Sequence, residues 1–514
     1  MAILNAVNGQ NPREIAARIL GRRRANGLFV EDLLEIALTS SASSNRDTEK
    51  SRTKAKDEDE TPMSAKDRAL CQELVFGCVR WQAALDWLIA QKTNGRRQPS
   101  GLQNLLRLGL YQIFWLDRIP PHAAVHETVE LAKRLGFGPQ AGFVNAILRG
   151  YLRAVDNTQK ILADLKIPNP AVGWSHPQWL VEKWRKRFGA EPARQLLEWN
   201  NTPPQTFARV NALKFRSRRR EEAQTSKSAI GNRQSAISQS LLTSAATTEL
   251  RETGDLLARW RDENVEYDFV RRNWLDENLV FELKWHPPLD SLESFRQGWF
   301  YIQDPGTLLA VAELNPQPGE IILDLCAAPG GKTTYIAQRM NNDGKIVACD
   351  VSDGRLKLLR ENCARLGATC VEPCSSRGNE APIKKSAIGD RQSAIDQSLL
   401  TSAAMDRKFD RVLVDAPCSN TGVLRRRVDL RWRISPAEIS CLRQTQLGLL
   451  RLAAPKLKPG GVLVYSTCSL EPEENAEVVK DFLREHKNFR LESERELLPF
   501  TNNVDGAFVA QMRK

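Results

Sequence analysis

The hydrophobic pattern changes character along the chain. In the first 155 residues, apolar side chains recur three and four positions apart, as in the run from Cys71 to Cys78. That spacing is typical of amphipathic helices. From residue 296 onward, short apolar runs alternate with helical stretches, which is typical of a parallel sheet wound with helices. The pattern therefore predicts an α/β protein, with an all-helical first part and a doubly wound core after it.

The first part of the chain is predicted to contain five helical stretches, and a polar loop separates the first from the second. These stretches are 12–38, Ser64–Ala90, Leu102–Ile113, Val125–Leu135 and Phe143–Leu152. Residues 39–63 are polar and charged throughout, so we expect a disordered loop there. Residues 156–295 are predicted to form a connector with a small subdomain. In it, the alternation of Phe207, Arg209 and Asn211 indicates a half-exposed strand, and Arg209 either contacts a phosphate or is simply solvated.

One sequence element occurs twice. Lys227–Ala246 recurs at Lys385–Ala404 with 18 of 20 positions identical. Repeat architectures show short regular periods in several copies, and two distant copies do not fit that pattern. We interpret them as two insertions of one element in surface loops, since lengthening a loop costs only about 0.6 kcal/mol per doubling.

The stretch Ile321–Met340 predicts a ligand site. A buried strand ends at Asp324, a small-residue loop follows, and the next residues have helical composition. A strand, a glycine turn and a helix form cofactor sites at the carboxyl edge of open sheets. The loop is Cys326, Ala327, Ala328, Pro329, Gly330, Gly331 and Lys332. It nearly matches the ATP-binding pattern GxxxxGK[ST] but has Cys326 at the first glycine position, so a phosphate loop and a plain turn stay open as alternatives.

Three further predicted strands also end in polar side chains. Asp350 ends the second strand, where an acid usually holds a ribose. The third and fourth strands run into Cys418 and Cys468, so two thiols are expected at the edge that carries the ligand loop. A thiolate that adds to C6 of a pyrimidine activates C5 toward an electrophilic methyl group, which is nucleophilic catalysis. A zinc site is weakly indicated, because CxxC and HxxxH spacings are lacking.

The composition of the chain indicates which kinds of partner and compartment suit it. The 514 residues carry 74 Lys and Arg against 62 Asp and Glu, a net charge of +12 that suits a polyanion. The ten cysteines are scattered, without a CxxC pair, as expected in the reducing cytoplasm, where a disulfide is not expected. We expect no metal, no membrane span, no export signal and a monomer.

Three motifs carry a family resemblance. DLCAAPGGKT (324–333), DAPCSNTGVLRR (415–426) and YSTCSLEPEEN (465–475) resemble the signature motifs of the Nol1/Nop2/Sun RNA cytosine-C5 methyltransferases. FYIQDPGT (300–307), RVN (209–211) and DGAFVAQ (505–511) agree with them. Residues 67–89, 105–136 and 143–153 resemble the NusB-like RNA-binding domain. A NusB-like domain in front makes the arrangement similar to the RsmB/Sun-type branch, whose substrate is small-subunit (16S) ribosomal RNA.

The resemblance implies S-adenosylmethionine as methyl donor and assigns roles by position. Cys468 would attack C6, and Cys418 would assist release of the methylated base. The loop Cys326–Lys332 would wrap the methionine part of the donor, and Asp350 would hold its ribose. Asp415 would lie near the donor sulfonium and the target base.

The resemblance also leaves points open. Arg425, Arg426 and Arg427, followed by Arg431 and Arg433, form a basic cluster suited to RNA phosphates. Family members carry an adenine-side Asp where this chain has none, so we expect the adenine contact either to be weaker or to come from Ser375 or Ser376. The predicted parts are 1–155, 156–295 and 296–514. Alternatives are a transfer-RNA methyltransferase, a non-catalytic assembly factor and a P-loop ATPase.

Overall fold

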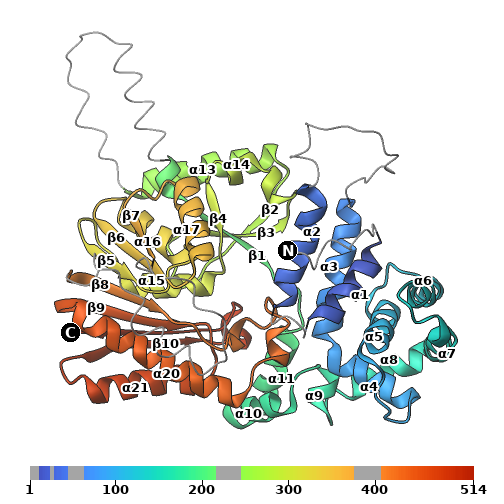
Figure 1. Cartoon of the computed structure of the whole chain (residues 1–514). Helices are drawn as coiled ribbons and strands as arrows, with labels where there is room; N and C mark the ends of the chain where they lie inside the picture. The colour runs from blue at the N-terminus through green and yellow to red at the C-terminus, as the bar shows by residue number, and fades with distance from the viewer. Residues whose placement is uncertain (1–10, 24–27, 44–62, 216–244, 376–406) are drawn as a thin grey trace, which may run out of the picture. The chain divides into compact units, whose positions relative to one another are not determined.

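The computed structural model describes residues 11–23, 28–43, 63–215, 245–375 and 407–514 (Figure 1). It divides into two compact units. The first comprises residues 1–202 together with 424–433, and the second comprises 203–423 and 434–514. These units do not coincide with the three predicted parts. The helices that follow residue 155 pack with the helical unit, and the small sheet packs in the same unit as the large one.

The first unit is helical, as predicted. Its helices are α1 Pro12–Arg22, α2 Val30–Ser43, α3 Ala65–Arg80, α4 Gln82–Lys92, α5 Ser100–Trp115, α6 Pro121–Arg134, α7 Ala141–Leu152, α8 Val155–Asp164, α9 Pro170–Gly173, α10 Gln178–Phe188 and α11 Ala190–Trp199. Two predicted helices are each replaced by a pair. Residues 12–38 form α1 and α2, and the stretch Ser64–Ala90 breaks at Trp81, which leaves helical geometry between α3 and α4.

A stretch distant in sequence completes the helical core. Val428 is buried among the side chains of the helical unit, and Trp432 packs against them. The indole nitrogen of Trp432 donates a hydrogen bond to the carbonyl of Val79, at 2.7 Å. Residues 424–433, which follow the predicted Cys418 turn a few positions later, therefore belong to the first unit and place Val428 in its core.

The second unit is built on a seven-stranded sheet. Its strands are β5 Ile321–Asp324, β6 Lys345–Asp350, β7 Val371–Ser375, β8 Phe409–Asp415, β9 Leu457–Thr467, β10 Arg490–Leu497 and β11 Ala507–Arg513. They follow the order β10-β11-β9-β8-β5-β6-β7, with β5 to β9 parallel and the last two antiparallel. The order reverses between β5 and β8, and such a switch point opens a crevice at the carboxyl ends of the strands.

Helices cover both faces of this sheet, as the doubly wound prediction requires. The helices are α15 Leu309–Leu314, α16 Gly331–Arg339, α17 Asp353–Leu366, α20 Pro436–Ala453 and α21 Ala476–Glu485. Neighbouring residues of β5 face opposite cores, because side chains alternate along a strand. Ile322 packs with α15, α16 and α17, whereas Leu323 packs with α20 and α21.

A smaller antiparallel sheet belongs to the same unit. It has the order β2-β3-β1-β4, formed by β1 Thr206–Val210, β2 Glu266–Phe269, β3 Val280–Trp285 and β4 Phe300–Ile302. The helices α13 Ala245–Asp262 and α14 Glu293–Arg296 accompany it. Trp260 of α13 is buried against the rings of Phe281 and Phe300, which anchors the helix to the sheet.

Several predictions differ from the structure or lie outside it. β9 begins at Leu457 and includes the glycines Gly460 and Gly461. The predicted loop 39–63 begins within α2, and residues 44–62 lie outside the described residues. Both repeats and Ser376 also lie outside them, except for the last two residues of the first repeat, which open α13. Within the described ranges, no helix combines the length and apolarity that a bilayer span needs.

Candidate active site

Two thiols meet at the carboxyl edge of the large sheet. Cys418 and Cys468 follow β8 and β9, which pair in parallel with Asp415 opposite Ser466. The two Sγ atoms are 3.4 Å apart. Cys418 is buried, and Cys468 is partly exposed. The hydrogen bond with Cys468, together with burial, raises the pKa of Cys418 well above its ordinary value, so the Cys418 thiol keeps its proton.

The two cysteine loops hold each other in place. The Cys468 thiol donates to the Asn420 Oδ1 at 2.9 Å, and the Asn420 amide donates to the Cys418 carbonyl at 2.7 Å. The Gly422 N–H donates to the Cys468 carbonyl at 2.9 Å. A Cβ at Gly422 would lie 2.8 Å from that carbonyl, so the close approach requires glycine. Sequence reasoning did not single out Asn420 or Gly422, although both lie in the motif DAPCSNTGVLRR.

Glu474 links the same two loops through hydrogen bonds. Its carboxylate accepts the Ser419 N–H at 2.8 Å, the Ser469 hydroxyl at 2.5 Å and the Gln446 amide at 3.2 Å, together with the Ser419 hydroxyl. The side chain is fully buried, and burial raises the pKa of Glu474 despite these donors. Sequence reasoning missed this residue, and its signal was an acid inside the motif YSTCSLEPEEN.

A lysine and a carboxylate lie next to the thiols. Lys332, in the first turn of α16, forms an ion pair with the Asp415 Oδ2 at 2.6 Å, and the Ser466 hydroxyl donates to the other oxygen at 2.7 Å. Burial alone would lower the pKa of Lys332. The charge and the hydrogen bond of Asp415, together with the charges of Cys468 and Asp324, outweigh that effect, and the net pKa of Lys332 is raised. Lys332 therefore stays charged beside both Asp415 and Cys468.

The loop Cys326–Lys332 is fastened to the tip of β6. The Ala328 N–H donates to the Asp350 Oδ2 at 3.3 Å, and the Ser352 N–H donates to the Asp350 Oδ1 at 3.0 Å. Arg355 lies 3.4 Å from the Asp350 Oδ2 and also donates to the Ala328 carbonyl. The structure thus brings Asp350 to the loop that the sequence predicted it would accompany.

Beneath this loop lies Asp324, which is 1% exposed. The Thr333 hydroxyl donates to its Oδ2 at 2.8 Å, while no donor in the described part of the chain reaches the buried Oδ1. Burial raises the pKa of Asp324 to about 7. Gly330 has φ +105, and a Cβ there would meet Leu359 at 2.6 Å. An unpaired acceptor under a glycine turn, with acids at two neighbouring strand tips, fits a polar cofactor such as S-adenosylmethionine.

Arg209 does not occupy the predicted position. It is fully buried in β1, where every residue from Phe207 to Val210 is buried, so the half-exposed strand prediction is wrong. Its guanidinium donates to Gln303 at 2.6 Å, to the Gly331 carbonyl at 2.7 Å and to Thr334 at 3.1 Å. Arg209 therefore fixes the cofactor loop from inside the protein, and a phosphate contact does not fit this placement.

The arginines of the predicted basic cluster differ in how deeply they are buried. Arg425 is 1% exposed and lies over the Trp199 ring at 4.0 Å, and Arg431 is fully buried with its guanidinium donating to Asn200 and Asn201 at 2.8 Å. A phosphate contact does not fit either arginine, because both belong to the interior of the helical unit. Arg426 is partly exposed and Arg427 is exposed, so their predicted RNA contact stays a prediction.

Within the described residues, no group of three or more His, Cys, Asp or Glu side chains is placed to hold a metal ion. Ser375 ends β7 at the edge where the adenine-side residue was expected. Its neighbour Ser376 lies outside the described residues, so the replacement for the missing Asp stays a prediction.

Family models match three parts of the chain. Residues 311–513 match the 16S rRNA methyltransferase RsmB/F model, and residues 10–153 match the NusB family. Residues 176–236 match the ferredoxin-like domain of RsmF/B-like methyltransferases. Along the chain, the NusB match comes first, the ferredoxin-like match second and the methyltransferase match last.

Relatives match over most of their length. A probable ribosomal RNA small subunit methyltransferase B of Synechocystis sp. is 34% identical over 475 residues, covering 88% of this chain and 92% of the relative. Proteins of the same name from Bacillus subtilis, where it is also called probable, and from Escherichia fergusonii are each 32% identical, with the same coverage. The crystal structure of PH0851 shares the fold, with a TM-score of 0.66 and 22% identity over 98% of this chain and 99% of that one.

The thiol pair, the loop over Asp324 and the matches along nearly the whole chain lead to one conclusion. The chain belongs to the RsmB/F family of S-adenosylmethionine-dependent methyltransferases that act on small-subunit ribosomal RNA.

Proposed function

We propose that the protein methylates C5 of a cytosine in 16S ribosomal RNA through a covalent bond between Cys468 and C6. The observation that carries this proposal is the 3.4 Å distance between the Sγ atoms of Cys418 and Cys468 at the edge that holds the cofactor loop. Two thiols in contact suit a reaction that needs one sulfur to attack and a second group to help the first one leave.

Each residue has a task in this proposal. Cys468 loses its proton and adds to C6, so electron density moves to C5. S-adenosylmethionine, when bound, supplies an electrophilic methyl group to that carbon. A base then removes the C5 proton, and the electron pair that returns to the ring expels the Cys468 thiolate. The charge of Lys332, whose ion pair with Asp415 keeps it in position, lies beside Cys468 and would stabilise the negative charge on the sulfur as it leaves C6.

Cys418 has the features of a proton holder. Its thiol is buried against Cys468, and its raised pKa keeps it neutral. A neutral S–H beside the departing sulfur can donate a hydrogen bond to the thiolate as it leaves C6. We therefore assign product release to Cys418 and the attack on C6 to Cys468.

The donor would be held by the loop and strand tips described above. Cys326 through Lys332 would contact its methionine part, Asp350 its ribose, and Asp415 would lie near the sulfonium. The Arg209 bond to the Gly331 carbonyl supports this arrangement, because it fixes the backbone of the loop. Arg426 and Arg427 remain candidates for contacts with RNA phosphates.

We further propose that the protein acts as a monomer in the cytoplasm. One chain supplies both thiols, the loop and the acids, so the chemistry requires no second copy. Transfer RNA is the alternative substrate, and the ribosomal RNA named for the relatives favours 16S RNA.

Bisulfite sequencing of 16S RNA tests the proposal. RNA from a strain that lacks the protein should have lost one protected cytosine. The wild-type gene should restore protection, and Cys468→Ala should not, although its RNA binding is retained. Protection restored by Cys468→Ala would refute the role of that thiol. Isothermal titration with S-adenosylmethionine separates the assembly-factor alternative, which predicts no binding.

A further inference from the structure

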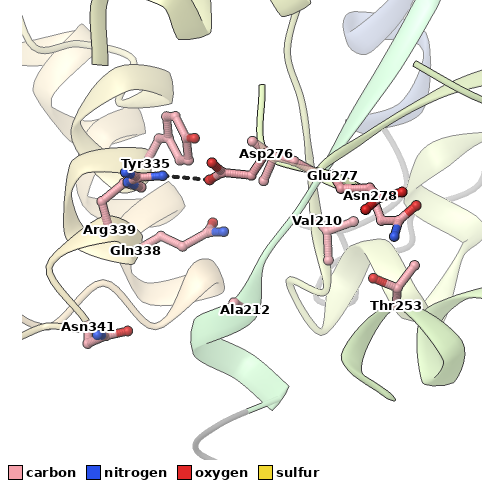
Figure 2. A pocket seen from close by; sticks show the side chains of 11 residues that line it. Val210, Ala212, Thr253, Asp276, Glu277, Asn278, Tyr335, Gln338, Arg339 and Asn341 are labelled. Atoms are coloured by element: carbon pink, nitrogen blue, oxygen red, sulfur yellow. Dashed lines mark hydrogen bonds and ion pairs between the residues drawn. The ribbon is translucent and has the colours of Figure 1, made fainter. Parts of the chain in front are cut away.

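A cavity of about 190 Å³ lies in the second unit, between α16 and the turn before β3 (Figure 2). None of the residues that line it belongs to the site described above. A cavity needs only roughly 10–15 Å³ on such a measure to hold one water, so there is room for a small organic molecule.

One wall of the cavity carries an unpaired acceptor. Gln338 of α16 is 9% exposed, and no donor in the part of the chain that the structure describes reaches its Oε1. Figure 2 shows its amide pointing from α16 toward Val210 and the turn that contains Glu277. Buried acceptors without a partner are rare, because leaving one unpaired costs free energy. The Gln338 Oε1 therefore offers a place for an N–H donor of a ligand.

The charges around the cavity favour a cation. Asp276 and Glu277 are both exposed at its rim, and Arg339 forms an ion pair with Asp276 at 2.5 Å (Figure 2). Tyr335 stays neutral, because burial raises its pKa to about 12. One arginine against two carboxylates leaves a single negative charge. A phosphate or carboxylate ligand would be repelled by that charge, whereas a monocation would neutralise it.

We infer that this cavity binds a small organic monocation with N–H donors, such as a guanidinium or primary ammonium group. One N–H would bond to the Gln338 Oε1, and the positive charge would face Glu277. Ion pairing to a carboxylate and a bond to a buried acceptor act together only for such a ligand, because a neutral donor gains a hydrogen bond from Glu277 but no ion pair.

Isothermal titration of the full chain with methylguanidinium chloride and with ethylammonium chloride tests the inference. Saturable binding is expected, and Gln338→Leu and Glu277→Gln should each weaken it at least about tenfold. Glu361→Gln, which removes an exposed carboxyl of α17 outside the cavity, is the matched control and should leave the affinity unchanged. Binding that is absent, or that survives both cavity variants, overturns the inference.

Further probes decide the class of ligand. Neither sodium phosphate nor sodium acetate should displace the bound cation, and displacement by either anion would overturn the inference. Gln338→Leu removes the unpaired acceptor, so its Tm should equal or exceed that of the wild type. If this variant does not fold, the affinity of the Glu277→Gln variant, whose substitution is at an exposed position, decides the inference. These readouts do not use methyl transfer, so failure here leaves the proposed RNA chemistry unaffected, and the reverse also holds.

Discussion

Replacing Asp324 by Asn removes a buried ionisable group next to the cofactor loop and keeps the shape of the side chain. The carboxyl is 1% exposed, and burial raises its pKa from 3.8 to about 7. Asn cannot ionise, but its Oδ1 can still accept the Thr333 hydroxyl that bonds to Asp324 at 2.8 Å. The two proteins therefore differ mainly in whether position 324 takes part in the pH dependence of folding.

The sign and size of the effect follow from the two pKa values. Between pH 3.8 and about 7, the folded protein holds a proton on Asp324 that the unfolded chain has released. Folding is then favoured by acid, and this contribution is lost as the pH rises through that window. At about 1.4 kcal/mol for each pKa unit, the whole window corresponds to about 4 kcal/mol. About 3 kcal/mol of it falls between roughly pH 5 and roughly pH 8.

Urea unfolding of both proteins across that range measures the effect. The free energy of unfolding of Asp324→Asn, relative to the wild type, should rise by about 3 kcal/mol from roughly pH 5 to roughly pH 8. Taking the difference cancels the other titrating groups that the two proteins share. Glu361→Gln controls for the loss of a carboxyl as such, and its difference should stay level. A level difference for Asp324→Asn would show that this carboxyl ionises normally and would refute the reasoning.

Three further substitutions test separate contacts. Arg431→Met should destabilise the helical unit by about 3 kcal/mol, because it leaves buried carbonyls without a donor; an unchanged thermal unfolding curve would contradict that. Lys332→Met should slow single-turnover methylation at least about tenfold by removing a charge beside Asp415 and Cys468, and an unchanged rate would argue against it. Glu474→Ala should lower the free energy of unfolding by about 3 kcal/mol through the unpaired Ser419 N–H, as urea titration would reveal. No loss would show that the loops hold without it.

The positions of the strand tips could be predicted from the sequence, because each is fixed by local signals. A buried apolar run that ends in a polar residue determines both the strand and the edge at which its last side chain lies. For that reason Asp350, Asp415 and the two cysteines lie at one edge of the sheet. The parallel pairing of β8 with β9 places the two cysteine loops next to each other. Glu474 and Asn420 were missed, because the partners that link the two loops, Ser419 for Glu474 and Cys468 for Asn420, lie on the other loop of the pair.

The predictions for the arginines failed because the burial of a basic residue is not fixed by local signals. A run of basic residues predicts a solvated or RNA-binding face only if the segment stays on the surface, which is a property of the whole fold. Arg425 and Arg431 lie in a stretch that is part of the core of the helical unit, and Arg209 lies in a strand that is buried on both faces. The pattern of apolar spacing also could not show the break at Trp81, because α3 and α4 continue the same periodicity on either side of it.

The most direct test of the central claim is a denaturing gel of Cys418→Ala incubated with 16S RNA and S-adenosylmethionine. Without the second thiol, release should fail, and a slowly migrating band of protein joined to RNA should accumulate. The double variant Cys418→Ala/Cys468→Ala should show no such band, because the attacking sulfur is gone. A Cys418→Ala sample without the band, or a band that persists in the double variant, would contradict the assignment of the two cysteines.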